Sequence, residues 1–194
     1  MKRLLLRNLV LLFAALVATS SLALAADAYK IDNAHSSANF TVKHMGISTV
    51  HGRFTEVTGT VLFNPQDVTK SSVKAVIRAA SVTTDNAMRD KHLNSPEFFD
   101  TAKFPEIRFE STAIRALGGD KYVAVGNLTI RDKTHSVEIP FTLAQGKGMQ
   151  GEARLGIEGN LTINRFDYDV SYDSTGVAIS KEVKIDLSVE AAKQ

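Results

Sequence analysis

Apolar and polar residues alternate along much of the chain, and this pattern limits it to a fold built from strands. In the longest alternating run, the apolar residues are Val183, Ile185, Leu187 and Val189, and each is followed by a polar residue: lysine, aspartate, serine and glutamate in turn. Similar runs occupy residues 38–42, 73–77, 107–110 and 137–143. Each such strand has one apolar and one polar face, so we expect an antiparallel all-β fold of roughly eight strands.

Turn-forming residues separate the alternating runs at spacings that suit hairpins. They include Asn64-Pro65, Gly118-Gly119-Asp120 and Gly146-Lys147-Gly148. The segment from Asp85 to Phe99 is different, because it contains helix formers and the helix-start signal Ser95-Pro96-Glu97. We expect one or two short helices there.

Periodicity alone does not distinguish a sandwich of two sheets from a closed barrel. A barrel removes the exposed edges of the sheet, and eight strands enclose room for side chains or for one small ligand. Pro140, inside the 137–143 run, predicts an edge or a bulge at that point.

Residues 1–25 have the order of residues found in a secretory signal peptide. Lys2, Arg3 and Arg7 precede an apolar run over residues 9–17, and Ala23-Leu24-Ala25 has the form that signal peptidase accepts. The run is shorter than the ~20 residues that a membrane span needs. We expect cleavage near Ala25, export, and a single domain over residues 26–194 without stable membrane insertion.

Removal of the leader leaves 20 basic residues against 21 acidic residues, a net charge of −1. No basic stretch follows the leader, so nucleic acid is not an expected partner. The chain has no cysteine, which excludes disulfides, thiolate catalysis and cysteine-ligated zinc. The five histidines lack the spacing of metal ligands, and no Gly-x-Ser-x-Gly motif occurs, so we expect neither a metal site nor serine hydrolase chemistry.

Several short segments, spread along nearly the whole mature chain, stand in an order that is typical of one protein family. The segments are residues 31–36, 40–46, 50–54 with Gly59, 80–84, 89–95, 98–100, Phe104-Pro105, 107–111, 126–131 and Asn164-Arg165. They resemble the YceI-like family of periplasmic polyisoprenoid-binding proteins. The resemblance implies a lipocalin-like antiparallel eight-stranded barrel, a polyisoprenoid or similar amphiphile inside it, and neither catalytic machinery nor a cofactor. Two positions depart from the family: Asp169 stands where glycine is common, and Asn127 where aspartate is more common.

A ligand tail in a barrel is held because apolar surface leaves water, at about 25 cal/mol per Å². The cavity should therefore be lined by aliphatic and aromatic side chains. Our candidates are Phe40, Val42, His44, Phe54, Phe98, Phe99, Phe104, Ile107 and Phe109. The alternative is that these side chains pack the core and leave no cavity.

Arg89, Asp90 and His92 lie close together on the predicted helix. They are our candidates for contact with a polar head group at the mouth of the barrel. The alternative is a structural role, in which Arg89 or Asp90 pins the helix by bonding to the backbone or to a partner such as Arg165.

These observations favour a non-enzymatic lipid carrier or buffer, acting in transport or stress response, with a polyisoprenoid or isoprenoid quinone as its ligand. A second hypothesis is an enzyme or redox accessory that acts on an isoprenoid quinone through the cluster of Arg89, Asp90 and His92. A third is a structural or partner-binding role, which would place an apolar patch outside the barrel. The oligomeric state, a homodimer included, is left open by the sequence.

Overall fold

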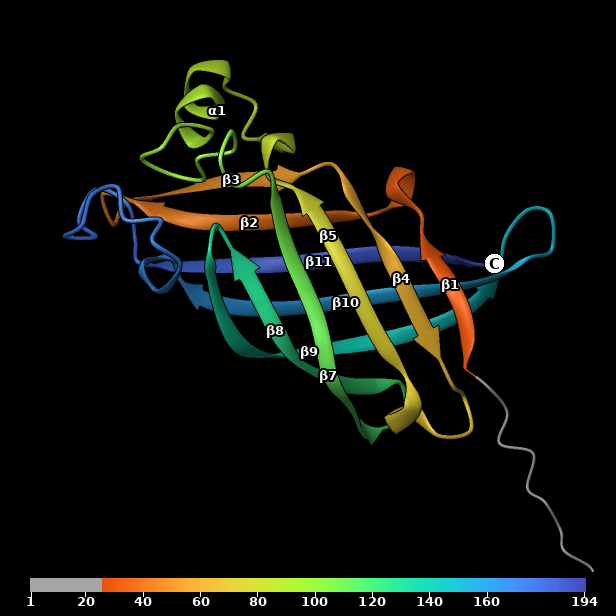
Figure 1. Cartoon of the computed structure of the whole chain (residues 1–194). Coiled ribbons are helices and arrows are strands. Elements are labelled where there is room, and N and C mark those ends of the chain that lie inside the picture. Colours follow the sequence, from red (N-terminus) through yellow and green to blue (C-terminus); the bar gives the residue numbers. More distant parts are fainter. Residues whose placement is uncertain (1–25) are drawn as a thin grey trace, which may run out of the picture.

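The structure, a computed structural model, describes residues 26–194, and the predicted signal peptide lies outside the described residues. The described chain forms one sheet of 11 strands with a single α-helix at one end (Figure 1). The strands are β1 (Asp27–Ile31), β2 (Ser37–His44), β3 (Ser48–Phe54), β4 (Val57–Phe63), β5 (Ser72–Arg78), β6 (Val82–Thr83), β7 (Glu106–Gly118), β8 (Lys121–Ile130), β9 (Lys133–Lys147), β10 (Ala153–Asn164) and β11 (Glu182–Lys193). The helices are α1 (Ala87–Leu93) and the 3-10 helices η1 (Asn33–His35), η2 (Val68–Lys70), η3 (Ala79–Ser81) and η4 (Arg165–Tyr168).

Eight of the strands close into an antiparallel barrel. The hydrogen-bonded order is β1-β4-β5-β7-β8-β9-β10-β11, and β11 then pairs with β1. The closing ladder is short and joins Tyr29 to Lys193, Lys30 to Ala192, and Ile31 to Ala191. This closure confirms the expected eight-stranded barrel over the two-sheet sandwich.

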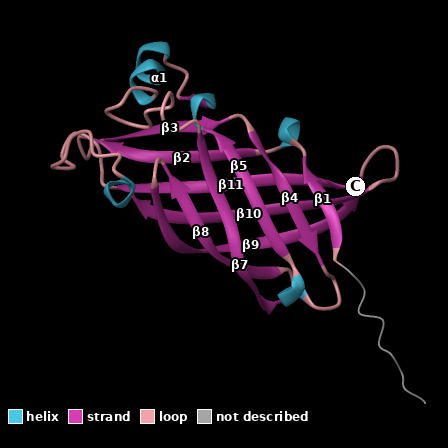
Figure 2. Ribbon diagram, in the orientation of Figure 1, coloured by secondary structure: helices cyan, strands magenta, loops and turns pink. Residues whose placement is uncertain are grey.

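On the edge that faces away from β10, strand β11 pairs with two different strands along its length, so the sheet branches there. The sequence did not predict this branch. The last residues of β11 pair with β1, whereas Lys184–Ser188 pair with β2. Strands β3 and β6 continue the branch that starts at β2, and Figure 2 shows β3 beside β2. The wall therefore gains three strands at the end of the barrel where β11 begins.

The alternation of residues decides which side chains face inward. In β11, the four apolar residues of the 183–189 run line the interior, whereas Lys184 and Asp186 between them are exposed. Pro140 of β9 is paired with Val123 of β8, but the ladder between β9 and β10 begins only at Phe141. Pro140 thus lies at a local edge of the sheet, as predicted for a residue without an N–H.

The single α-helix lies at the end of the molecule that also holds the β2–β3 turn and the β10–β11 loop (Figure 1). Its N-terminus is capped by Asn86, whose side chain accepts a hydrogen bond from the Arg89 backbone N–H. The predicted helix start at Ser95-Pro96-Glu97 forms consecutive turns instead, in which the Phe98 N–H donates to the Ser95 carbonyl. No helix within residues 26–194 is long and apolar enough to cross a membrane.

The opposite end, where β11 closes on β1, is filled by side chains. Leu155 and Ala191 have 0% exposure there. They belong to a cluster with Tyr29, Ile31, Val57, Val61 and Phe63. We call this cluster the packed end, and the region of α1, the β2–β3 turn and the β10–β11 loop the open end.

Candidate functional site

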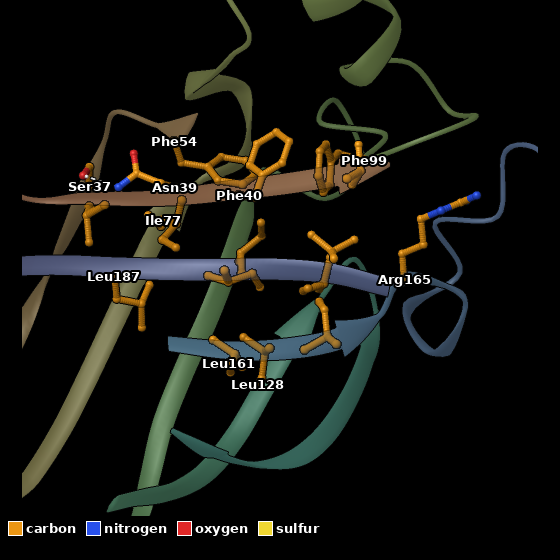
Figure 3. Close-up of a pocket in the computed structure, with 18 of the residues that line it drawn as sticks. Ser37, Asn39, Phe40, Phe54, Ile77, Phe99, Leu128, Leu161, Arg165 and Leu187 are labelled. Carbon is orange, nitrogen blue, oxygen red and sulfur yellow. Dashed lines mark hydrogen bonds between the residues drawn. The ribbon is translucent and has the colours of Figure 1, made fainter. Parts of the chain in front are cut away.

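A cavity of ≈ 790 Å³ occupies the barrel between its two ends (Figure 3). This volume lies within the 300–1,000 Å³ typical of small-molecule sites. The floor is formed by residues of the packed end, among them Ile31, Val57 and Val61. Lining residues that are exposed to solvent, such as His44, Ser48 and Met88, lie at the open end. The cavity therefore opens there.

Eight of the nine residues that the sequence predicted as lining surround this cavity. They are Phe40, Val42, His44, Phe54, Phe98, Phe99, Ile107 and Phe109. They come from β2, β3, β7 and the segment after α1.

Phe104 does not line the cavity, so its predicted position is wrong. It precedes β7 and lies in a turn, where its N–H donates to the Asp100 carbonyl at 2.8 Å. The alternation of a strand therefore does not set its direction. Its ring instead lies beneath the Arg131 guanidinium, at 5.3 Å from the ring centroid, and near the Lys103 ammonium.

Two phenylalanines of the wall occupy space that a glycine on the neighbouring strand leaves free. A Cβ built on Gly52 of β3 would lie 2.2 Å from Cζ of Phe40, which is far inside van der Waals contact. A Cβ on Gly126 of β8 would likewise lie 2.7 Å from Cζ of Phe109. The two glycines therefore allow large rings to lie over the sheet, and this placement helps to keep the tunnel open.

Aromatic contacts connect the wall to the segment that follows α1. The Phe40 and Phe54 rings are 5.7 Å apart, and Phe54 meets Phe99 edge-on at 5.4 Å. Figure 3 shows Phe40, Phe54 and Phe99 along the same side of the tunnel.

Asp90 does not lie on the cavity wall. Its carboxylate accepts hydrogen bonds from the Thr83 hydroxyl at 3.1 Å, and from the backbone N–H and hydroxyl of Thr84 at 2.8 and 2.5 Å. Arg89 does line the cavity, yet its Nε donates to the Thr84 hydroxyl and its Nη2 to the Thr84 carbonyl. This pair holds α1 to the residues that precede it, as the structural alternative anticipated, and neither residue bonds to Arg165.

His92 also lies on the cavity wall and connects α1 to other segments of the open end. Its Nε2 contacts the Glu97 carboxylate. Its ring meets Phe98 at 4.9 Å and Tyr172 of the β10–β11 loop at 4.8 Å, both edge-on. His92 is therefore placed both to hold the mouth together and to contact a ligand.

Arg165 is a residue of the cavity wall that the sequence analysis did not place in the site. It follows β10, is only 4% exposed, and lines the cavity. Its guanidinium donates five hydrogen bonds, at 2.7 to 3.3 Å, to backbone carbonyls of the β10–β11 loop: those of Val170, Tyr172, Asp173, Ile179 and Ser180. Asn164-Arg165 was part of the family resemblance, but nothing in the local sequence shows that its partners are carbonyls.

Charge in this loop is balanced around Arg165. Burial lowers the pKa of Arg165, and the nearby Asp173 carboxylate opposes that shift. The pKa of Asp173 is lowered by hydrogen bonds from the Thr175 hydroxyl and from the Ile179 and Ala178 backbone, and by the charge of Arg165. The two groups thus favour each other's charged forms, and together they fix the course of the loop.

The loop begins with a strained turn at Asp169, one of the two departures from the family. Asp169 has a φ of 57°, the left-handed region in which glycine is common. Its carboxylate pairs with Lys133 at 3.0 Å, and its carbonyl accepts from Arg131. The chain thus keeps a glycine-like turn with an aspartate. Asn127, the second departure, is an exposed residue of β8 outside the cavity.

Titratable side chains on the cavity wall are His44, Arg89, His92, Arg165 and Tyr172, and within residues 26–194 no carboxylate lines it. The remaining polar lining groups include Ser37 and Asn39, which are hydrogen bonded to each other at 3.2 Å. Such a wall is compatible with a long apolar chain that carries a neutral or anionic head group.

Asp32, His35 and Glu190 form a group with metal-ligand spacing, but it lies at the packed end, away from the cavity. Arg154 already donates to Asp32 at 2.8 Å, and it also donates to Glu190 and Glu152. Hydrogen bonds from His35 and then from Arg154 lower the pKa of Asp32 to about 2. The group therefore works as an ion-pair network across the ends of β10 and β11.

The chain is similar to known proteins both in sequence and in structure. Residues 29–191 match the YceI-like domain family. A UPF0312 protein of Yersinia pestis (strain Pestoides F) is 39% identical over 182 residues, which are 92% of this chain and 93% of the relative. BcnA of Burkholderia cenocepacia has a similar structure, with a TM-score of 0.76 at 26% identity over 82% of this chain and 98% of BcnA.

A polyisoprenoid binding domain from Saccharophagus degradans, implicated in plant cell wall breakdown, has a TM-score of 0.69 over 87% of this chain and 99% of that domain. Its identity of 17% shows a shared fold alone. The family match, in contrast, covers nearly all of the described residues, and the relative from Yersinia is 39% identical over 92% of the chain. The chain therefore belongs to the YceI-like domain family.

Proposed function

We propose that the protein is exported to the periplasm and there holds a polyisoprenoid, or a similar long-chain amphiphile, in its barrel without transforming it. The observation that carries this proposal is a ≈ 790 Å³ cavity lined by aliphatic and phenylalanine side chains and open at one end. Burial of an apolar chain contributes about 25 cal/mol of binding free energy for each Å² of apolar surface removed from water. Binding of this kind depends little on the chemistry of the head group. The fold shared with a polyisoprenoid binding domain supports the same ligand class.

The direct test is to purify the mature protein from its own host and to identify bound lipid by native mass spectrometry and solvent extraction. We expect about one amphiphile for each barrel. A protein that carries no amphiphile, and that takes up none from detergent-solubilised isoprenoid quinone or polyprenol, would contradict the proposal. Leu128→Trp, which would fill the cavity from its wall, should lower the lipid content, whereas Leu117→Trp on the exposed surface should leave it unchanged.

Arg89 and His92 on the cavity wall favour one alternative, a redox accessory that acts on an isoprenoid quinone. Both side chains are already engaged by Thr84 and Glu97, so we favour binding without turnover. The alternative predicts quinone turnover that Arg89→Ala or His92→Ala abolishes while the quinone stays bound. Equal rates of quinone reduction with and without the protein would exclude the redox role and leave ligand binding as the proposed function.

A further inference from the structure

Large apolar side chains are exposed at the open end from three segments that are far apart in the sequence. Met45 and Ile47 of the β2–β3 turn are 56% and 86% exposed, Met88 of α1 is 83% exposed, and Tyr172 and Val177 of the β10–β11 loop are 40% and 71% exposed. We call these five residues the rim.

The three segments of the rim lie next to one another, because hydrogen bonds and ring contacts join them. The Met45 N–H donates to the Ala178 carbonyl at 2.9 Å, next to Val177. Tyr172 meets His92 of α1, and His92 lies one helical turn from Met88. Figure 1 shows the same three segments together at one end of the barrel.

The other exposed large apolar side chains of the described residues do not collect in this way. Leu62 lies on β4, Leu117 at the β7–β8 turn, and Met149 at the β9–β10 turn. Isolated apolar residues are normal on a soluble protein, whereas a cluster at a binding site indicates an interaction surface.

The rim is also continuous with the cavity. Met88 and Tyr172 belong to the cavity lining although they are exposed to solvent. A chain that leaves the cavity over these residues keeps apolar contact up to the outer surface. The same chain in water would expose its CH₂ groups, which is unfavourable.

Charge around the rim is balanced. Residues 43–48, 85–93 and 170–182, which carry the rim, contain four cationic side chains, Lys43, Arg89, Lys91 and Lys181, and four acidic ones, Asp85, Asp90, Asp173 and Glu182. A balanced surface does not select an oppositely charged partner. It is complementary to an electrically neutral surface into which apolar side chains can insert.

We infer that the rim docks on the surface of a zwitterionic phospholipid bilayer and inserts Met45, Ile47 and Val177, so that the ligand passes over Met88 and Tyr172 between bilayer and cavity without crossing water. This inference rests on the proposed function, because the ligand class makes a bilayer its source. Partial insertion of a few side chains gives weak, reversible binding, which suits a protein that must leave the membrane with its ligand.

The test is flotation of the mature protein with vesicles of phosphatidylcholine alone, compared between two triple variants. Met45→Ser/Ile47→Ser/Val177→Ser removes the inserted side chains, none of which lines the cavity, and the partition coefficient should fall by at least about tenfold. Leu62→Ser/Leu117→Ser/Met149→Ser makes the same chemical change at apolar positions outside the rim, and it should leave the partition coefficient unchanged. Raising the salt from 0.1 to 0.5 M, as the probe of charge, should have little effect.

Equal flotation of the rim variant and the unaltered protein would overturn the inference, and so would binding that needs anionic lipid and disappears at high salt. Capture of a protein partner by the rim in the absence of any flotation would overturn it as well. Lipid extracted from each variant separates this failure from failure of the proposed function. A rim variant that still holds its amphiphile shows that the cavity is intact, whereas a protein that floats but holds no amphiphile contradicts the proposed function alone.

Discussion

The two ends of the barrel are stabilised by different means. At the packed end, apolar side chains with no exposed surface fill the interior, and Arg154 joins three carboxylates across the strand ends. At the open end, single polar residues hold the segments: Asp90 holds α1 and Arg165 holds the β10–β11 loop. The difference indicates that the packed end maintains closure of the barrel, while the open end is held by directional bonds that leave apolar surface available to a ligand.

The largest expected effect is at Arg165. Arg165→Ala leaves five loop carbonyls without their donor in a buried position, so we expect a loss of about 3–4 kcal/mol in the free energy of unfolding, measured by urea denaturation. Hydrogen exchange should increase in the β10–β11 loop more than at the packed end.

The matched control for Arg165 is Arg78→Ala. Arg78 pairs with Glu56 on the surface, where both side chains are well exposed, so its removal should change the stability by less than about 1 kcal/mol. An Arg165→Ala protein as stable as the Arg78→Ala protein would show that directional bonds are not what holds the open end.

Leu155→Ala tests the packed end. It removes buried methyl groups at a position with 0% exposure, which costs about 3 kcal/mol for a typical cavity of this kind. Because Leu155 does not line the cavity, the folded variant should hold as much lipid as the unaltered protein, measured by extraction after purification. Loss of lipid in proportion to stability would contradict the separation of the two ends, and Leu117→Ala at an exposed site provides the baseline.

Gly52→Ala tests how the tunnel between the two ends is kept open. The new Cβ would lie 2.2 Å from the Phe40 ring, so the ring must turn toward the cavity. We expect about tenfold weaker ligand binding and a loss of about 1–3 kcal/mol in stability. Gly156→Ala in β10 is the control, since its nearest neighbour would be the Ala144 Cβ at 3.8 Å, an ordinary contact. Equal binding by the two variants would show that Phe40 does not limit the tunnel.

The strands were predictable because alternation is a local property. The 183–189 run of β11 and the edge at Pro140 follow directly from residue order. Barrel closure, in contrast, came from the family resemblance, because a short ladder such as Tyr29 with Lys193 leaves no signal in either segment. The branch of β11 was missed for the same reason.

The candidate site was predictable where its residues lie on strands. Phe40 and Phe109 follow the inward positions, whereas Phe104 stands in a turn and contacts Arg131 instead. All five hydrogen bonds of the Arg165 guanidinium go to backbone carbonyls, which every residue possesses, so no spacing of side chains could identify these partners. Asp90 was predicted at the mouth, but its neighbours Thr83 and Thr84 take up its carboxylate.

The smallest expected effect is the acid response of the network at the packed end. The pKa of Asp32 is about 2 in the folded protein, against 3.8 for an ordinary aspartate. The depressed pKa means that Asp32 stabilises the fold above pH 3.8, and that this contribution is lost as the pH falls toward 2. Asp32→Asn removes the titration but keeps an acceptor for the Ala34 N–H, so the urea midpoint should fall less steeply between pH 4 and pH 2 than in the unaltered protein. The same slope in both proteins would mean that His35 and Arg154 do not stabilise the Asp32 carboxylate, and the acid limb would then arise from other carboxylates with a lowered pKa, such as Glu152 beside Arg154 or Asp173 at the open end.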